Sequence, residues 1–267
     1  KYDLRPKKGL GQNFLLDEDV LEKIVDISGI GSSELASSAE VLEVGPGPGC
    51  LTRHLAARAE RVVAVELDRR FLPLLAEALA SWSNVTVVQG DILAFSPQNY
   101  FEQAYTVAAN IPYYITSAVI RHLLEAPVKP RRMVMTVQKE VAERICASAG
   151  NLSLLALGVQ VYGSAEYLFT VPAAAFFPQP NVDSAVLRID LFSQPLITPD
   201  RLDRFFALAK AGFGQKRKTL RNALSSNLHL NAAETALKLT AADIDPMRRA
   251  ETLTIPEWDR LLDAFGK

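Results

Sequence analysis

The sequence contains few of the residues that build metal centres and disulfide frameworks. Its 267 residues include only two cysteines, Cys50 and Cys146, and three histidines that are far apart in the chain. No metal-ligand spacing relates them, so we expect no metal site and a reduced, intracellular setting. No apolar run approaches the roughly 18 residues of a membrane span, and no signal peptide is visible. We therefore expect a cytoplasmic protein with no membrane partner.

The sequence also lacks an excess of charge, because its formal net charge is −1. Residues 193–267 nevertheless carry twelve Lys or Arg against nine Asp or Glu, a net of +3, whereas residues 1–192 carry −4. Within the C-terminal part, segment 210–221 has five positive charges and no acid. A second basic cluster opens the chain: Lys1, Arg5, Lys7 and Lys8. Clusters like these bind phosphates, although a solvated helix face explains them equally well.

What the sequence does contain is a regular alternation of short β-branched runs and helical patterns. Seven candidate strands are 41–44, 62–65, 84–88, 105–109, 132–137, 167–171 and 185–191. Helical patterns between them cover 51–59, 69–80, 117–125 and 139–147. This alternation predicts an α/β fold with a mainly parallel seven-stranded sheet that is covered on both faces. We expect the last two strands to form an antiparallel edge.

The pattern changes after Thr198-Pro-Asp, where only helical periodicity continues to the end of the chain. We expect helix caps at Thr240, Asp245 and Thr254. The sequence therefore predicts two domains, residues 1–192 and a small all-α domain of residues 193–267. No long exposed apolar helix requires a partner chain, which favours a monomer.

A glycine-rich turn, Gly45-Pro-Gly-Pro-Gly49, follows the first strand and leads into a helix. Glycine lets the backbone pass close to a ligand, and the helix start presents free N–H groups. The G-x-G-x-G spacing differs from the G-x-G-x-x-G of dinucleotide enzymes, and the two prolines add stiffness rather than phosphate donors. The turn favours a nucleoside held without a pyrophosphate, and a purely structural turn is the alternative.

Two acids follow the next two strands. Glu66 ends the second strand, and Asp91 follows the third. In open α/β sheets an acid at the first of these positions accepts hydrogen bonds from ribose hydroxyls. A carboxylate at the second can accept from an adenine amino group. Each acid alone is equally compatible with a helix cap or a solvated loop, but three consecutive strand ends predict one ligand-binding crevice.

The segment Asn110-Ile-Pro-Tyr113 ends a fourth strand. The N6 lone pair of adenine is delocalised into the ring, so this nitrogen is a poor nucleophile. The Asn110 amide oxygen and a backbone carbonyl near Pro112 could bind both N6 hydrogens and orient the nitrogen. Tyr113 could stack on the base, which is worth about 1–3 kcal/mol. The alternative is a tight Asn–Pro turn without chemistry.

Together these motifs resemble the ribosomal RNA adenine N6-dimethyltransferase family over nearly the whole chain. Gly11-Gln-Asn-Phe-Leu15 resembles the family's cofactor-covering segment. The glycine turn, Glu66, Gly90-Asp91 and Asn110–Tyr113 follow the family's motif order. Segment 176–184 resembles its late loop with a base-facing aromatic, and segment 215–222 resembles its basic C-terminal helix.

The resemblance implies a Rossmann-like class I methyltransferase that uses S-adenosylmethionine as methyl donor. Its partner would be small-subunit ribosomal RNA in an immature 30S particle, and its acceptors two adjacent adenines near the 3′ end of 16S ribosomal RNA. The implied cofactor contacts are Asn13, Leu15, Gly45, Gly47, Glu66, Leu67, Asp91, Ile92 and Asn110. The implied base site is Asn110, Pro112, Tyr113 and Phe176, with Tyr114 and Phe177 as alternative rings. The implied RNA contacts are Lys7, Lys8, Lys216, Arg217, Lys218 and Arg221.

Other functions remain compatible with the sequence. An RNA-binding small-subunit assembly factor with dispensable catalysis would hold RNA and yield no dimethyladenine. A large-subunit ribosomal RNA methylase conferring macrolide resistance would share the cofactor motifs, but the basic C-terminal segment and the late Phe-Pro loop weigh against it. A nicotinamide dehydrogenase is disfavoured by the glycine spacing and by the lack of an evident acid/base pair for hydride transfer.

Overall fold

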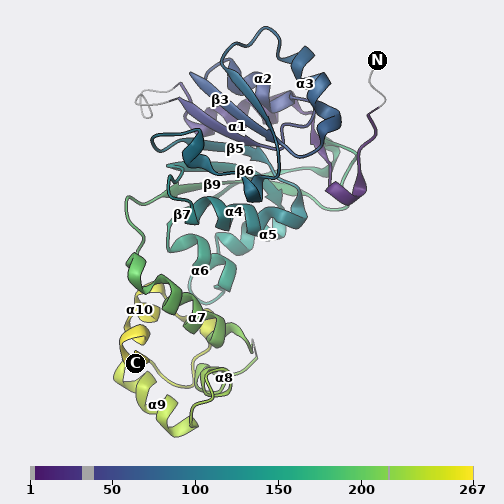
Figure 1. Ribbon diagram of the computed structural model, residues 1–267. Coiled ribbons are helices and arrows are strands. Elements are labelled where there is room, and N and C mark those ends of the chain that lie inside the picture. The colour runs from purple at the N-terminus through teal and green to yellow at the C-terminus, as the bar shows by residue number, and fades with distance from the viewer. Residues whose placement is uncertain (1–3, 32–38, 216, 267) are drawn as a thin grey trace. The chain divides into compact units, whose positions relative to one another are not determined.

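Figure 1 shows the computed structural model, which describes residues 4–31, 39–215 and 217–266. The chain divides into two compact units, Lys1–Ala142 with Ala165–Leu191, and Glu143–Ser164 with Phe192–Lys267. The expected boundary near residue 193 lies close to the last change between the units, after Leu191. Residues 143–164, however, group with the C-terminal helices, because the Gly150 and Leu152 N–H groups both donate to the Glu251 carbonyl, at 3.0 and 3.2 Å.

The first unit is built on a sheet whose strand order is β4-β3-β2-β5-β6-β9-β7. The strands are β2 (Glu40–Val44), β3 (Arg61–Glu66), β4 (Val85–Gln89), β5 (Thr106–Asn110), β6 (Arg132–Gln138), β7 (Gly163–Val171) and β9 (Ser184–Leu191). Strands β2 to β6 pair in parallel, whereas β9 runs antiparallel to β6. The seven predicted strands and the mainly parallel sheet are therefore confirmed.

The central strands are buried on both faces, as their continuous β-branched runs predict. In β2, β3 and β5 every residue but one is buried. The strand order reverses at β2, because β3 and β4 lie on one side of it and β5 and β6 on the other. Ligands of open α/β sheets bind at the carboxyl ends of the strands beside such a reversal.

The described residues of this unit form four α-helices, α1 (Glu18–Ser28), α2 (Cys50–Ala56), α3 (Leu72–Ala78) and α4 (Thr116–Glu125), and the start of a fifth, α5 (Lys139–Ile145), which ends in the second unit. The first of them was not predicted from the sequence. Its start is capped by Asp17, whose side chain accepts from the Val20 N–H, and its end is Gly29 with a φ of 74°. Helices commonly end at a glycine whose backbone adopts the left-handed conformation.

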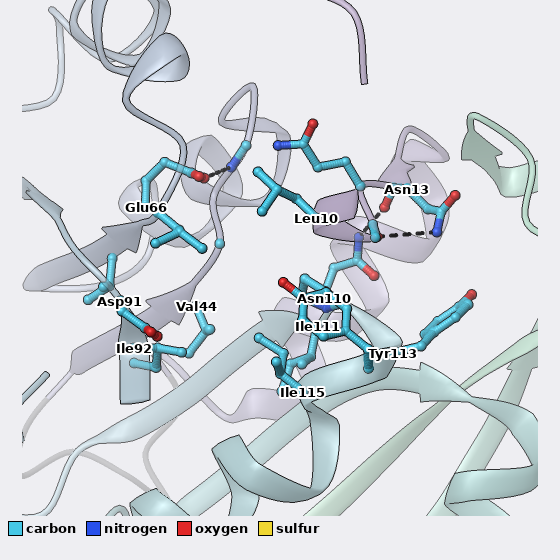
Figure 2. Close-up of a pocket in the computed structure, with 18 of the residues that line it drawn as sticks. Leu10, Asn13, Val44, Glu66, Asp91, Ile92, Asn110, Ile111, Tyr113 and Ile115 are labelled. Carbon is cyan, nitrogen blue, oxygen red and sulfur yellow. Dashed lines mark hydrogen bonds between the residues drawn. The ribbon is translucent and has the colours of Figure 1, made fainter. Parts of the chain in front are cut away.

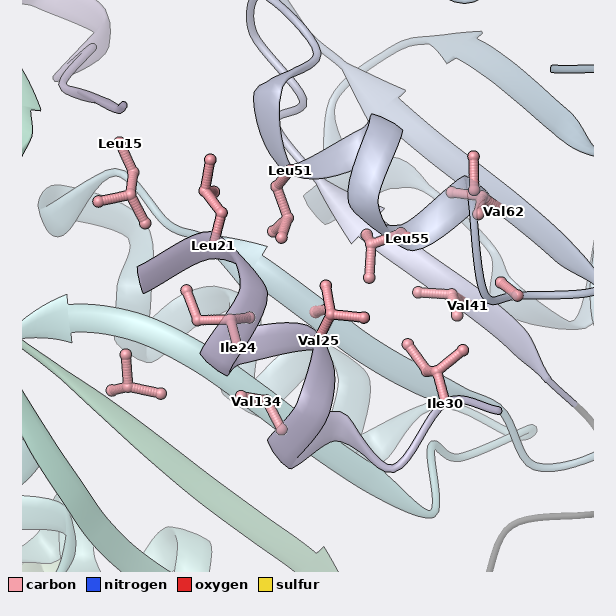
Figure 3. Close-up of a cluster of buried hydrophobic side chains, with 14 of the residues drawn as sticks. Leu15, Leu21, Ile24, Val25, Ile30, Val41, Leu51, Leu55, Val62 and Val134 are labelled. Atoms are coloured by element: carbon pink, nitrogen blue, oxygen red, sulfur yellow. The ribbon is translucent and has the colours of Figure 1, made fainter. Parts of the chain in front are cut away.

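The buried face of α1 follows a helical spacing. Leu21, Ile24 and Val25 are almost completely buried and pack in one cluster with Leu51 and Leu55 of α2 (Figure 3). Each such side chain contributes about 1.5–3 kcal/mol when it is fully buried. This cluster fixes α1 beside the sheet and thereby fixes where the preceding residues enter the fold.

A second, very small sheet was also not predicted. Strands β1 (Phe14–Leu15) and β8 (Phe176–Phe177) pair antiparallel, with Phe14 opposite Phe177 and Leu15 opposite Phe176. The Leu16 N–H adds a hydrogen bond to the Ala175 carbonyl at 3.0 Å. The N-terminal segment is thus attached to the late proline-rich loop.

The second unit is helical in its described residues after β9, as expected. Its helices are α6 (Leu154–Gln160), α7 (Leu202–Phe213), α8 (Leu220–Asn227), α9 (Ala232–Ala241) and α10 (Ile255–Ala264). Thr254 caps α10 with a capping box, which confirms one predicted cap. The other two are wrong: Thr240 lies inside α9 and donates to the Ala236 carbonyl, and the Asp245 side chain accepts from Met247 in a turn that starts no helix.

Alanine substitutions of two helical glycines in this unit should have opposite effects on stability. A Cβ at Gly212 would lie 2.5 Å from Trp258 Cη2, whereas a Cβ at Gly158 would meet nothing within 4 Å. Gly212→Ala should therefore lower the free energy of unfolding by about 1–3 kcal/mol. Gly158→Ala should raise it by up to about 1 kcal/mol. Urea unfolding of both variants, followed by circular dichroism, checks this, and equal shifts would contradict the packing around Trp258.

Candidate active site

A pocket opens at the carboxyl ends of β2, β3, β4 and β5, and residues 10–14 form another part of its wall (Figure 2). The strand ends are level, since Val44 pairs with Val65 and Ala109, and Glu66 with Gln89. The pocket brings together ten of the predicted site residues: Asn13, Gly45, Gly47, Glu66, Leu67, Asp91, Ile92, Asn110, Pro112 and Tyr113.

Two of the predicted cofactor and base residues do not line this pocket. Leu15 and Phe176 are 3% and 5% exposed and pack into the same core cluster as Leu21. Successive side chains of a strand point to opposite sides, so Phe176 points inward while Phe177 is 59% exposed. The structure therefore places Phe177, rather than Phe176, within reach of a molecule arriving from solvent.

The two adjacent tyrosines both line the pocket but differ in environment. The Tyr113 hydroxyl lies 2.7 Å from Ser184 Oγ, and burial raises the pKa of Tyr113. Tyr114 is 60% exposed. A Cβ at Gly11 would lie only 3.1 Å from Tyr114 Cδ1, so this ring packs against the N-terminal segment. Tyr113 is thus the held ring and Tyr114 the open one.

The glycine turn opens the floor of the pocket. Gly45 and Gly47 have φ angles of 68° and 54°, which residues with a side chain rarely adopt. A Cβ at Gly45 would meet nothing within 4 Å, so that position faces open space. A Cβ at Gly47 would lie 2.8 Å from Phe14 Cε1. One glycine therefore leaves room for a ligand, and the other lets the Phe14 ring approach.

Glu66 joins this turn to the end of β3. One carboxylate oxygen accepts from the Gly47 N–H at 2.9 Å and the other from the Asp68 N–H at 2.7 Å. The residue is 5% exposed, and burial raises its pKa while these backbone hydrogen bonds oppose the rise. Each oxygen keeps a second lone pair for a ligand hydroxyl.

Asp91 follows β4 and is exposed at the pocket. Its Oδ1 accepts from the Leu93 N–H at 2.9 Å and so caps a short 3-10 helix. A carboxylate has a second oxygen, here Oδ2, with which it can accept from a ligand amino group. The helix cap and the ligand contact, which the sequence left as alternatives, are therefore compatible in one residue.

Asn110 ends β5 and is oriented by the N-terminal segment. Its Nδ2 donates to the Asn13 backbone carbonyl at 2.8 Å (Figure 2). A carbonyl can only accept, so the amide nitrogen must face Asn13 and Oδ1 is directed elsewhere. The Pro112 carbonyl accepts from the Ile115 N–H at 3.1 Å, which fixes the turn that follows.

The predicted RNA contacts are spread over several elements. Arg217 and Lys218 are exposed between α7 and α8, where the Lys218 N–H donates to Gln215 in a turn. The expected basic helix is therefore interrupted. Arg221 lies in α8 and is half-buried, and Lys7 Nζ lies 3.9 Å from Asp68 Oδ1. Lys216 and the side chain of Lys8 lie outside the described residues.

Sequence reasoning missed several residues of this site. Gln12 and Phe14 lie within the recognised N-terminal segment but had no assigned role. Asp68, two residues after Glu66, is 5% exposed and is bonded by Arg70 and Gln12. Glu43 is 2% exposed in β2 beneath the pocket, with Oε2 lacking a hydrogen-bond partner. A charged residue inside an apolar strand was the available signal for Glu43.

Comparison with known proteins identifies the group to which this site belongs. The family model of ribosomal RNA adenine dimethylases matches residues 4–264. The chain belongs to this family. The resemblance drawn from the sequence motifs is confirmed, and the protein is an S-adenosylmethionine-dependent ribosomal RNA adenine dimethyltransferase.

Individual relatives of this dimethyltransferase match over nearly their full lengths. A ribosomal RNA small subunit methyltransferase A of Dehalococcoides mccartyi strain CBDB1 is 44% identical over 262 residues, which are 97% of this chain and 88% of that protein. The protein of the same name from Bacillus mycoides strain KBAB4 is 44% identical over 276 residues, covering 99% and 93%.

Solved structures of two methyltransferases are similar to this chain over nearly its whole length. A dimethyladenosine transferase from Plasmodium falciparum has a TM-score of 0.79 at 26% identity, covering 94% of this chain and 97% of that one. The 23S rRNA methyltransferase ErmE has a TM-score of 0.75 at 28% identity, covering 95% and 100%.

The groups that line the pocket fit the cofactor of this dimethyltransferase. Open space beside Gly45 would admit a nucleoside, Glu66 would accept from ribose hydroxyls, and Asp91 would accept from an amino group. Among the described residues, no His, Cys, Asp and Glu side chains group as a metal site, and no helix is long and apolar enough to cross a membrane. The bound cofactor supplies an electrophilic methyl group on a sulfonium.

Glu43 predicts a pH dependence of stability. Burial raises its pKa from 4.5 to about 8, so the folded state keeps a proton that the unfolded chain loses. The free energy of unfolding should fall by up to about 5 kcal/mol as pH rises from about 4.5 to 8, at 1.36 kcal/mol per pKa unit, and then level off.

Glu43→Gln should remove this loss, so that the variant is more stable than the wild type at pH 9 and similar to it at pH 5. The exposed Glu102 supplies the matched control, Glu102→Gln. Urea unfolding between pH 5 and 9 measures the effect. If the free energy of unfolding changed with pH in the same way in wild type and Glu43→Gln, the buried carboxyl would not be the cause of the pH dependence.

Proposed function

We propose that this enzyme dimethylates N6 of two adjacent adenines near the 3′ end of 16S ribosomal RNA, acting on an immature 30S particle during ribosome biogenesis. The observation that carries the proposal is 44% identity, over nearly the whole chain, to proteins named ribosomal RNA small subunit methyltransferase A. The proposal includes a cytoplasmic enzyme that acts as a monomer.

The base site activates the target nitrogen by orienting it. Asn110 Oδ1, turned away from Asn13, accepts one N6 hydrogen. A backbone carbonyl beside it accepts the second: Ile111 lines the pocket wall, and its carbonyl takes this role while the Pro112 carbonyl accepts from the Ile115 N–H. Two acceptors favour a pyramidal nitrogen whose lone pair is available for attack. Tyr113 stacks on the base, and the hydrogen bond to Ser184 holds its ring.

No strong base takes part in the attack. Asn110 is neutral, and the N6 proton becomes acidic only after the nitrogen has gained a methyl group. The protein contributes mainly positioning and electrostatics. Because two methyl groups are added in turn, the pocket also accepts the monomethyl form, and one of the two polar contacts relaxes before the second transfer.

The RNA outside the pocket meets exposed groups. Arg217 and Lys218 contact phosphates, and the exposed Phe177 and Tyr114 offer faces to bases that flank the target. Phe176, whose ring packs in the core, supports this loop from beneath.

Two other functions are less well supported. A large-subunit methylase is disfavoured because identity to ErmE is 28%, against 44% to the small-subunit relatives. An assembly factor with dispensable catalysis would not require a pocket with cofactor acceptors beside an oriented amide.

The decisive experiment is incubation with isotope-labelled S-adenosylmethionine and 30S particles that lack the modification, followed by mapping of the modified base. We expect dimethyladenine at two neighbouring positions near the 3′ end of 16S ribosomal RNA. Labelling of large subunits alone would contradict the substrate assignment, and particle binding without label would favour the assembly factor.

The role of the amide predicts a rate effect. Asn110→Ala should slow methyl transfer on the order of 10²-fold, because one preorganised contact to the reacting nitrogen is lost. Asn99→Ala, at the exposed end of a short 3-10 helix, is the control. Rates are measured from product per time at saturating substrates. Full dimethylation by Asn110→Ala at the wild-type rate would disprove the proposed contact.

Cofactor and RNA contacts should separate by substitution. Glu66→Gln keeps the side-chain shape but loses the charge, and it should weaken cofactor binding about 10-fold with RNA binding retained. Combined Arg217→Ala and Lys218→Ala should weaken RNA binding and leave cofactor binding unchanged. The slope of the logarithm of the RNA-binding constant against the logarithm of salt concentration should become shallower by roughly 0.7–0.9 per lost phosphate contact. Calorimetry with cofactor and filter binding with RNA measure the two effects, and swapped results would refute the assignment.

A further inference from the structure

The hydrogen bond between Asn110 and the N-terminal segment connects the base site to a second network. We infer that Gln12 is a positioning residue: its hydrogen bond to Asp68 fixes the Asn13 carbonyl, which in turn orients the Asn110 amide. This inference rests on the proposed function, because it concerns the oxygen that faces the target adenine.

The Asn110 side chain needs an external constraint. An amide presents an acceptor on one side and donors on the other, and a rotation of its terminal torsion by half a turn exchanges them. With Nδ2 toward the pocket, Asn110 would offer the N6 amino group a donor instead of an acceptor. The Asn13 carbonyl at 2.8 Å allows only the productive orientation. The base site therefore depends on where that carbonyl lies.

Gln12 holds the chain immediately before Asn13. Its Nε2 donates to Asp68 Oδ2 at 3.1 Å, and its Oε1 accepts from the Lys7 N–H at 2.7 Å. Both ends of one side chain are thus engaged, one across the pocket rim and one within the segment. Fixing the Gln12 side chain limits the displacement of the adjacent Asn13 carbonyl.

Asp68 is a rigid anchor for this hydrogen bond. It is 5% exposed, and Arg70 Nε lies 3.0 Å from both of its carboxylate oxygens. The Arg70 guanidinium, with a smaller contribution from Gln12, holds the pKa of Asp68 well below its usual range. Its backbone N–H donates to Glu66 at 2.7 Å. The network therefore runs from the proposed cofactor acid, through Asp68 and Gln12, to the amide at the base.

The other side of Asn13 is held independently. The Phe14 ring packs against Phe71, with centroids 5.4 Å apart, and beside Gly47. Pairing of β1 with β8 continues this attachment at Leu15. Loss of the Gln12 side chain should therefore leave the segment seated and the pocket closed on that side, while the Asn13 carbonyl gains freedom.

A matched pair of variants tests the inference in the full-length protein. Gln12→Met keeps the side-chain length and removes the hydrogen bonds, and Gln103→Met makes the same change on an exposed loop. The first readout needs neither RNA nor cofactor: it is the Asn110 side-chain amide signal in nitrogen-15 NMR, assigned by its loss in Asn110→Ala. We expect its protons to exchange with solvent about 10-fold faster in Gln12→Met and unchanged in Gln103→Met.

The second readout separates rate from affinity. At saturating S-adenosylmethionine and 30S particles, single-turnover methyl transfer by Gln12→Met should fall on the order of 10-fold. Its dissociation constant for the cofactor should change less than about 3-fold. Should Gln12→Met fail to fold, Gln12→Asn, shorter by one methylene, replaces it with the same expectations.

Two results would overturn the inference. One is an unchanged Asn110 amide signal in Gln12→Met together with a wild-type rate. The other is a rate that more cofactor restores fully, because the segment would then act only through cofactor binding. The wild type in the same assay tests the proposed function separately: if it transfers no methyl group to 30S particles, that function fails whatever the NMR result.

Discussion

The parallel pairing of β2 with β3 and β5 is the constraint on which the active site depends. Parallel strands in register bring their carboxyl ends to one edge, and the reversal of strand order at β2 leaves an opening there. Gly45, Glu66 and Asn110 reach the same pocket because each follows or ends one of these three strands. These three residues would not meet at one pocket without this register.

The sheet supplies only part of the pocket, and residues 10–14 supply another part. They are attached at three places of different chemistry: a carboxylate at Asp68, an aromatic contact at Phe71, and a backbone ladder at β8. The same residues give the site the Asn13 backbone carbonyl. This group belongs to the main chain, so no side-chain substitution could provide it directly. A neutral amide at Asn110 therefore acquires a defined direction from the chain that covers it.

The parts of this molecule that could be predicted from the sequence are those with a local signal. Glu66 and Asn110 each end a continuous buried strand, and Asp91 follows the β-branched run of the edge strand β4, so all three could be placed at one edge. Contacts between distant segments have no such signal, which is why β1, β8 and the bond between Gln12 and Asp68 were missed. Phe176 was assigned to the base by resemblance to the family's late loop, with Phe177 as the alternative, because the sequence alone does not show that a strand turns the two rings to opposite sides. The basic segment was expected as one helix, because charge alone does not reveal the turn at Gln215 and Lys218.

The pairing of β1 with β8 has a consequence for the order in which the protein becomes competent. Phe14 and Leu15 leave the ribosome early, but their partners Phe177 and Phe176 are made only after β2 to β7 have been synthesised. A nascent chain that has completed the central parallel strands still lacks the ladder that secures its own beginning. The segment that forms the N-terminal wall of the pocket is thus secured by its ladder only after residue 177 has been made, when β1 can pair with β8.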